Sequence, residues 1–490
     1  MSGGGASRSD LEVLPRRTDL PIALVVATFY LLVSLTTEKI TACNGFGDDG
    51  CAYGTWALDF PRYAFEGRLG SYAIQRSFPS LVAWAALKAL HLAPTPPRVV
   101  AAFQAMNVVM VFVGTFTWLK IARILRIRAT ATLFGTLALF GTYGTLKFTT
   151  WYPVLGDLWG YALGFVCLYA YLTRRLFLIV PAALVGAFSW PSLFPPAVLL
   201  LFFWESRDEP ARAPLRLHHV VGIGAGVAWV LLALDLVRQR YWPPSVGPVE
   251  TMPQLVRLSL LVTAGYWYFA LRRLADYGAF YHPRLYWRAL TSPAGALGIT
   301  LLVLVQWFQK RASVPEVAGA ETWFKFTVIS TTWKPGIFLL AYVVYFGPMI
   351  LVLLLRWRDV TSLLARHGAG LVAATVLGTV FGIDCEERHG YTFLALVMPF
   401  ALKVLDDAIV DVRALTKLAV LSAVFSKLWI TLPPYPTGTT WDYPAQTVFL
   451  SQGPWMSNMM YLLQGVVVVL IAIWMHRVLK QPDRALAAPS

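Results

Sequence analysis

Residues 21–51, PIALVVATFYLLVSLTTEKITACNGFGDDGC, join an apolar run directly to a loop that holds two adjacent carboxylates. The run from 21 to 37 has no charged side chain and is close to the length that an α-helix needs to cross a bilayer. Asp48 and Asp49 follow it in a glycine-rich stretch. The combination predicts a membrane helix that leads into a tightly turning acidic loop.

The composition of the whole chain agrees with a membrane protein. Of its 490 residues, 57% are hydrophobic and 14% are charged, and the mean hydropathy is +0.59. Soluble domains carry roughly 25% charged residues, so we expect an all-α, polytopic membrane protein. The net charge of +15 comes from short basic runs beside apolar segments, as in cytoplasmic loops, and nucleic-acid binding is not predicted.

Further apolar segments have the length and composition of spanning helices. Residues 174–216 are basic at both ends and are interrupted by Trp190-Pro191 and Pro195-Pro196. This segment is better explained as a hairpin of two short helices than as one span. We therefore expect about 12–14 transmembrane helices. The candidate spans are 21–37, 98–118, 129–147, 153–173, 177–189 and 192–204 (the hairpin), 218–237, 255–271, 290–307, 337–355, 368–383, 391–405, 415–431 and 460–476.

The basic runs all fall on one face of this topology, which the positive-inside rule assigns to the cytoplasm. We expect residues 1–20 to form a cytoplasmic tail before a retained first span, 21–480 to form the transmembrane domain, and 481–490 to form a second cytoplasmic tail. Residues 38–97 then make a long outer loop. Within it, 78–92 predicts an amphipathic surface helix, and 59–69 predicts a shorter one.

Asp48 and Asp49 have three interpretations. Neighbouring carboxylates repel, which raises one apparent pKa and provides a general base near neutral pH. They are also oxygen ligands suited to a divalent cation such as Mg²⁺ or Mn²⁺. The third interpretation is a solvated turn. Cys43 and Cys51 flank the pair and are candidates for a disulfide if the loop faces an oxidising compartment.

Other candidate binding residues collect on the same outer face. Asp157 lies in an apolar run, where a carboxylate is either functional or paired with a neighbouring cation. Arg388 is suited to bind phosphate bidentately, with His389 as a donor or proton carrier, although a helix-end ion-pair cluster is an equal alternative. Glu386 orients Arg388 under either interpretation. The remaining candidates for binding a lipid phosphate or a sugar are Lys334, Tyr53, Trp151 and Trp190, and a further aromatic and acidic group is Trp441, Asp442 and Tyr443.

These features resemble the GT-C class of membrane glycosyltransferases, which use polyprenyl-phosphate-linked sugars. The resemblance rests on the first span and its acidic loop, on YPVLGDLWGYALGFVCLYAYLTRR (152–175), and on EERHGYTFLALVMPFALKV (386–404), which is similar to an E-x-R-Y-x-x-x-x-x-P element with His389 in place of Tyr. It implies an inverting transfer of a hexose or pentose outside the cytoplasm, in cell-envelope biogenesis, to a glycan or lipid-linked acceptor. Asp48 or Asp49 would then be the base, while Arg388, His389 and Lys334 would neutralise the lipid phosphate.

Two other classes of protein fit parts of the pattern. A polysaccharide polymerase or ligase would use the same lipid phosphates but depends on arginines and a histidine more than on an early acidic pair. A secondary transporter or lipid flippase would account for the interrupted hairpin and for Asp157. Transporters usually contain related halves, which this sequence does not show, and their charges lie near the middle of the membrane.

Overall fold

The computed structural model describes residues 13–66, 69–206, 217–243, 249–314, 320–409, 411–428 and 453–480, except for the side chains of Asp48, Ala320 and Lys480. Within these ranges the regular secondary structure is helical, and the β-structure consists of two isolated bridges, Val13–Arg128 and Gly70–Val314. The predicted all-α class is confirmed. Trp441, Asp442 and Tyr443 lie outside the described residues.

Helices occur at every position predicted for a span. Their bounds are α1 Asp19–Thr36, α7 Pro96–Ile124, α8 Ala129–Phe140, α10 Asp157–Thr173, α11 Leu176–Ser189, α12 Phe194–Phe202, α13 Leu217–Arg238, α14 Val256–Leu274, α16 Pro293–Ala312, α18 Ile337–Phe346, α19 Met349–Leu355, α21 Ala369–Phe381, α22 Tyr391–Ala408, α23 Val412–Phe425 and α25 Asn458–Lys480. The connecting helices are α2 Ala42–Gly45, α3 Asp48–Leu58, α4 Phe60–Phe65, α5 Ser71–Ile74, α6 Phe78–Ala89, α9 Tyr143–Leu146, α15 Pro283–Thr291, α17 Ala320–Ser330 and α20 Trp357–His367.

Several of these helices are long and apolar enough to cross a bilayer. Among the described residues the qualifying stretches are Arg16–Thr36, Pro96–Ile124, Leu217–Arg238 and Asn458–Leu479, and α15 with α16 qualifies as a pair bent by 77°. The molecule is therefore a polytopic membrane protein. The predicted number of 12–14 spans remains a prediction, because other apolar helices, such as α8 and α18, are only 10–17 residues long.

The exposed side chains of α1 show why these helices require a lipid environment. Only one stripe, which includes Ala23 and Ala27, is buried, and α1 packs against α7. On the opposite side Leu35 is 73% exposed and Val25 is 69% exposed. Large apolar side chains exposed in this number along a helix are typical of a lipid-facing surface.

Prolines and glycines set the breaks between helices. The predicted hairpin forms as α11 and α12, and the chain is extended at Trp190. Pro195 and Pro196, which were predicted to interrupt this segment, instead lie in the first turn of α12, where a missing N–H costs no hydrogen bond. The predicted span 337–355 is divided at Gly347, which has φ +86° and precedes Pro348.

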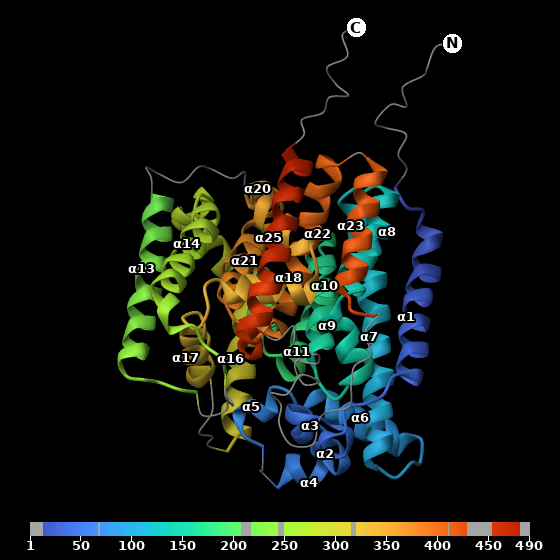
Figure 1. Cartoon of the computed structure of the whole chain (residues 1–490). Helices are drawn as coiled ribbons and strands as arrows, with labels where there is room; N and C mark the ends of the chain where they lie inside the picture. The colour runs from blue at the N-terminus through green and yellow to red at the C-terminus, as the bar shows by residue number, and fades with distance from the viewer. Residues whose placement is uncertain are drawn as a thin grey trace, which may run out of the picture.

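The two ends of the helical bundle differ (Figure 1). α1 begins and α25 ends at the same end, whereas α2 to α6 form a compact group at the opposite end. Ion pairs fasten basic helix ends near the start of α1 and the end of α22: Arg123 pairs with Asp19 at 2.5 Å, and Arg128 with Asp406 at 2.6 Å. The predicted surface helices are present in the group at the other end as α6 and α4.

Candidate active site

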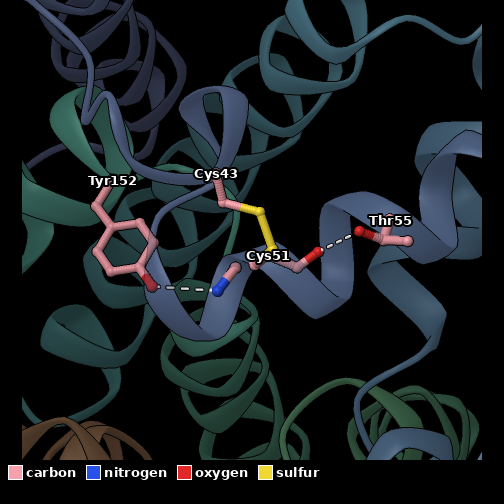
Figure 2. Close-up of a disulfide and its surroundings, with 5 residues drawn as sticks. Cys43, Cys51, Thr55 and Tyr152 are labelled. Carbon is pink, nitrogen blue, oxygen red and sulfur yellow. Dashed lines mark hydrogen bonds between the residues drawn. A yellow bond between two sulfur atoms is a disulfide. The ribbon is translucent and has the colours of Figure 1, made fainter.

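The acidic pair, predicted to lie in a loop, instead begins helix α3, and the start of this helix is held from both sides. Cys43 and Cys51 are joined by a disulfide, with their Cα atoms 5.6 Å apart (Figure 2). The backbone N–H of Gly50 donates to the Tyr152 hydroxyl at 3.1 Å. Gly47 has φ +81°, and a Cβ atom there would lie 2.2 Å from the Tyr152 ring, so only glycine lets the loop pass this ring.

Asp49 and Arg388 meet although 339 residues separate them in the chain. One Nη atom of Arg388 lies 2.5 Å from a carboxylate oxygen of Asp49. The Nε atom of Arg388 donates to Glu386 at 2.6 Å, as the sequence predicted for Glu386. The Arg388 side chain is 12% exposed and that of Asp49 is 42% exposed, so the pair lies at an accessible edge. The structure places these three predicted residues together.

The electrostatic state of Asp49 differs from the expectation for a repelling acidic pair. Burial raises the pKa of Asp49, but attraction and hydrogen bonding from Arg388 lower it, with further lowering by Arg76 and His389, and the net shift is downward. Asp49 is therefore ionised at neutral pH. The Asp49 carboxylate can accept a proton, but it acts as a strong base only after Arg388 releases the carboxylate oxygen that it holds.

His389 lies in a short helical turn, Glu387–Gly390, directly beside this pair. Its Nδ1 atom is 2.7 Å from Asp384, and the Trp323 indole N–H donates to the same carboxylate oxygen at 2.8 Å. Trp190 lies against the imidazole, with ring centroids 5.9 Å apart and planes inclined by 30°. Asp384 and Trp323 were not selected as site residues from the sequence, because neither has a spacing that links it to His389.

Asp157 is the first residue of α10 and is completely buried. Neither of its carboxylate oxygens has a hydrogen-bond partner in another described residue. Asp157 interacts electrostatically with Arg388, His389 and Asp49, which places it beside the Asp49–Arg388 pair. A buried carboxylate with open acceptor positions is a site for a ligand donor or a proton.

Arg76 is a cation of this site that the sequence did not single out. Its guanidinium lies 3.8 Å from the centroid of the Tyr72 ring and 5.5 Å from that of Trp190, and it attracts Asp49. Tyr53, a predicted binding residue, is linked to Arg76 through Tyr72, since the Tyr53 hydroxyl lies 3.4 Å from the Tyr72 hydroxyl. An isolated arginine in a long loop carries no sequence signal that would have identified it.

Lys147 and Glu387 form a second buried pair near Arg388. Lys147 is 1% exposed and lies in a π-helical turn, Lys147–Trp151, and it interacts electrostatically with Glu387 and Arg388. Burial raises the pKa of Glu387, although Lys147 opposes the shift. A signal for Lys147 was present in the sequence, because an ionisable residue at the end of an apolar run is a functional candidate by default.

Three predicted binding residues, Lys334, Trp151 and Trp190, lie in surroundings that differ from those expected for groups that bind a lipid phosphate or a sugar. Lys334 donates to the carbonyl of Met456, and it interacts electrostatically with Glu250 and Cys385. Burial lowers the pKa of Lys334 to about 8. Trp151 is 0% exposed and Trp190 is 2% exposed, so neither indole presents an accessible face to a sugar. Buried neighbours, which a sequence does not reveal, account for these differences.

The proposed divalent cation has no group of ligands in the described part of the chain. Three or more His, Cys, Asp or Glu side chains arranged to hold a metal do not occur there. Asp49 is engaged by Arg388, and the side chain of Asp48 lies outside the described residues. Asp48 thus stays a predicted base or metal ligand, and no chemical step is derived through a metal.

Comparisons with known proteins leave the family open. No protein-family model matches the chain, and no curated protein matches its sequence. Among solved structures, the archaeal oligosaccharyltransferase AglB from Archaeoglobus fulgidus, in complex with an inhibitory peptide and a dolichol-phosphate, matches with a TM-score of 0.46 and 11% identity. The match covers 88% of this chain and 57% of that one. A similarity at this level establishes neither a shared fold nor a shared activity.

Proposed function

We propose that the protein is a membrane glycosyltransferase of the GT-C type that moves a hexose or pentose from a polyprenyl-phosphate donor to a glycan or lipid-linked acceptor. The reaction takes place at the end of the molecule formed by α2 to α6, on the extracytoplasmic face. The observation that carries this proposal is the contact of Asp49 with Arg388, at the edge of a membrane bundle and next to Asp157. A polyprenyl phosphate requires a cation at this level, and its acceptor requires a nearby carboxylate.

The residues have separate roles in this reaction. Arg388 binds the phosphate through its planar fork of N–H donors, and Glu386 holds the guanidinium in place. As the phosphate takes over the Nη atoms of Arg388, Asp49 is released and accepts the hydroxyl proton of the acceptor. Asp157 accepts a hydrogen bond from the sugar or acceptor. Attack on the face opposite the phosphate inverts the configuration at the anomeric carbon.

Substitution of the carboxylates tests the proposal. Asp49→Asn removes the proton acceptor and should lower sugar transfer from a synthetic polyprenyl-phospho-sugar by about 10²–10⁴-fold. Asp59→Asn, at an exposed acid of the same outer loop, is the matched control and should retain transfer. Full transfer by Asp49→Asn, with the fold intact by thermal unfolding, would rule out Asp49 as the base.

Native mass spectrometry of the purified protein provides an independent test. A co-purifying polyprenyl phosphate or polyprenyl-phospho-sugar is expected, and Arg388→Gln should lose it. Uptake of a substrate into vesicles by the Asp49→Asn protein, with no lipid phosphate bound to the wild type, would indicate a transporter instead.

A further inference from the structure

Asp384 is a completely buried carboxylate whose oxygens both have partners. One oxygen accepts the backbone N–H of Glu386 at 2.9 Å. The other lies 2.7 Å from Nδ1 of His389 and 2.8 Å from the indole nitrogen of Trp323. Three nitrogens therefore converge on one carboxylate, and two of them, the Glu386 backbone and the Trp323 indole, are N–H donors to it.

This arrangement determines which nitrogen of His389 carries a proton. The Trp323 indole nitrogen lies 3.3 Å from Nδ1 but only 2.8 Å from the Asp384 oxygen, so its N–H is directed mainly to the carboxylate. An ionised carboxylate only accepts, so the 2.7 Å contact of Nδ1 with Asp384 requires a proton on Nδ1. The uncharged ring then has its lone pair on Nε2, and the charged ring has its second N–H there. Trp190 lies nearly parallel to the imidazole and Trp323 meets it edge-on, at 84°. The ring is thus fixed on both sides, and Nε2 is left for a ligand.

We propose that Asp384 is the positioning residue of the site, and that with Trp323 it holds His389 so that Nε2 donates a proton to the phosphate of a lipid-linked donor. This inference rests on the proposed function and assigns the acid of that reaction. As the acceptor oxygen bonds to the anomeric carbon, the bond from this carbon to the phosphate oxygen breaks and its electron pair stays on the phosphate. The Nε2 proton passes to that oxygen, and the acceptor proton passes to Asp49.

The charges around His389 favour the protonated ring. Burial lowers the pKa of His389, but the carboxylates of Asp384 and Glu386 raise it more, while Arg388 opposes them, so the net shift is upward. Asp49, from α3, and Asp157, from α10, also face this group. The imidazolium therefore persists above about pH 6.5, where a free histidine is half protonated, and it is lost as the pH rises through the raised pKa of His389. The affinity for a phosphate bound through Nε2–H should fall over the same pH range.

The experiment measures the affinity of the purified full-length protein for dodecyl phosphate, a single-chain lipid phosphate. Titrations are made from about pH 5 to about pH 9 at roughly one-unit steps, a range in which histidine titrates. Wild-type affinity should fall about tenfold per unit above the His389 pKa, the slope expected for one proton. Asp384→Asn should begin this fall at lower pH, and His389→Gln should leave only the dependence caused by the second ionisation of the phosphate itself, near about pH 6. Asp59→Asn, at an exposed acid of the outer loop that has no contact with this group, is the control and should retain the wild-type dependence.

A second readout is independent of phosphate. In protein labelled with ¹⁵N-histidine, His389, assigned from the His389→Gln spectrum, should have Nδ1 protonated at every pH, and Asp384→Asn should change this pattern. Binding whose pH dependence is the same in the wild type, Asp384→Asn and His389→Gln would overturn the inference while leaving the proposed function intact. If dodecyl phosphate binds at no pH, the proposed function and this inference both fail. Should Asp384→Asn not fold, His389→Gln and the wild-type ¹⁵N pattern decide.

Discussion

Gly160 is the residue of α10 against which the Trp190 ring packs. A Cβ atom there would lie 2.3 Å from the indole, so Gly160→Ala must displace a ring that stacks on His389. We expect a loss of about 1–3 kcal/mol in stability, as for other overpacked sites, and weaker binding of dodecyl phosphate. Thermal unfolding and titration of the purified variant measure both.

The matched control is Gly224→Ala in α13. No atom lies within 4 Å of a Cβ at Gly224, so alanine there should be neutral or stabilising by about 0.5–1 kcal/mol through its helix propensity. If Gly160→Ala binds lipid phosphate as tightly as Gly224→Ala does, the position of Trp190 does not matter for the site.

For single residues, the sequence predicted which side chains are reactive or ionic better than it predicted where they lie in the fold. Asp49, Arg388, Glu386 and His389 were selected because each is a reactive or ionic group in a dense polar run, and the structure brings them together. Lys334 was selected for the same reason, yet it hydrogen-bonds to the carbonyl of Met456 instead. Nothing in the local sequence distinguishes the two cases, because the partner in each lies far away in the chain.

At the scale of elements, the disulfide and Tyr152 together fix the start of α3, which carries Asp49. Removing the Cys43–Cys51 bond by a double Cys→Ser substitution frees the small loop that it closes, and such bonds typically contribute about 2–4 kcal/mol. We expect a lower unfolding temperature and weaker transfer, with the bundle still folded. Unfolding in detergent with and without dithiothreitol measures the contribution.

The double variant is also the control for this measurement. Cys167 and Cys385 are free and buried, so dithiothreitol should lower the unfolding temperature of the wild type and leave that of the variant unchanged. An unchanged wild-type temperature would mean that Tyr152 and the surrounding packing hold the loop alone.

Helix positions were predictable because an apolar run of sufficient length has few other stable states in a bilayer. Helix interruptions were less predictable. Pro195 and Pro196 start α12 instead of breaking it, whereas Gly347 and Pro348 divide one predicted span into α18 and α19. A proline is tolerated in the first turn of a helix and disruptive in its interior, and the position of that first turn depends on the packing of the preceding segment.

At the scale of the whole molecule, the two ends of the bundle lie on opposite sides of the membrane if the positive-inside rule holds. The start of α20 is fastened to the end of α25, where Arg356 donates to the carbonyl of Leu479 at 3.1 Å, and α4 lies at the opposite end (Figure 1). Basic residues collect at the α20 end, including Arg123 and Arg128 in their ion pairs. The proposed reaction requires the α4 end to be extracytoplasmic, because Asp49 lies in the same loop.

Cysteine labelling in intact cells tests this orientation. Glu66, at the end of α4, and Ser362, in α20, are both exposed, and the native cysteines are either bridged or buried. A membrane-impermeant maleimide should label Glu66→Cys before lysis and Ser362→Cys only after it, with the unsubstituted protein as the blank. Labelling of Ser362→Cys alone in intact cells would place Asp49 and Arg388 in the cytoplasm, where the Cys43–Cys51 bond would be reduced. The extracytoplasmic reaction would then be excluded, whatever lipid phosphate the protein binds.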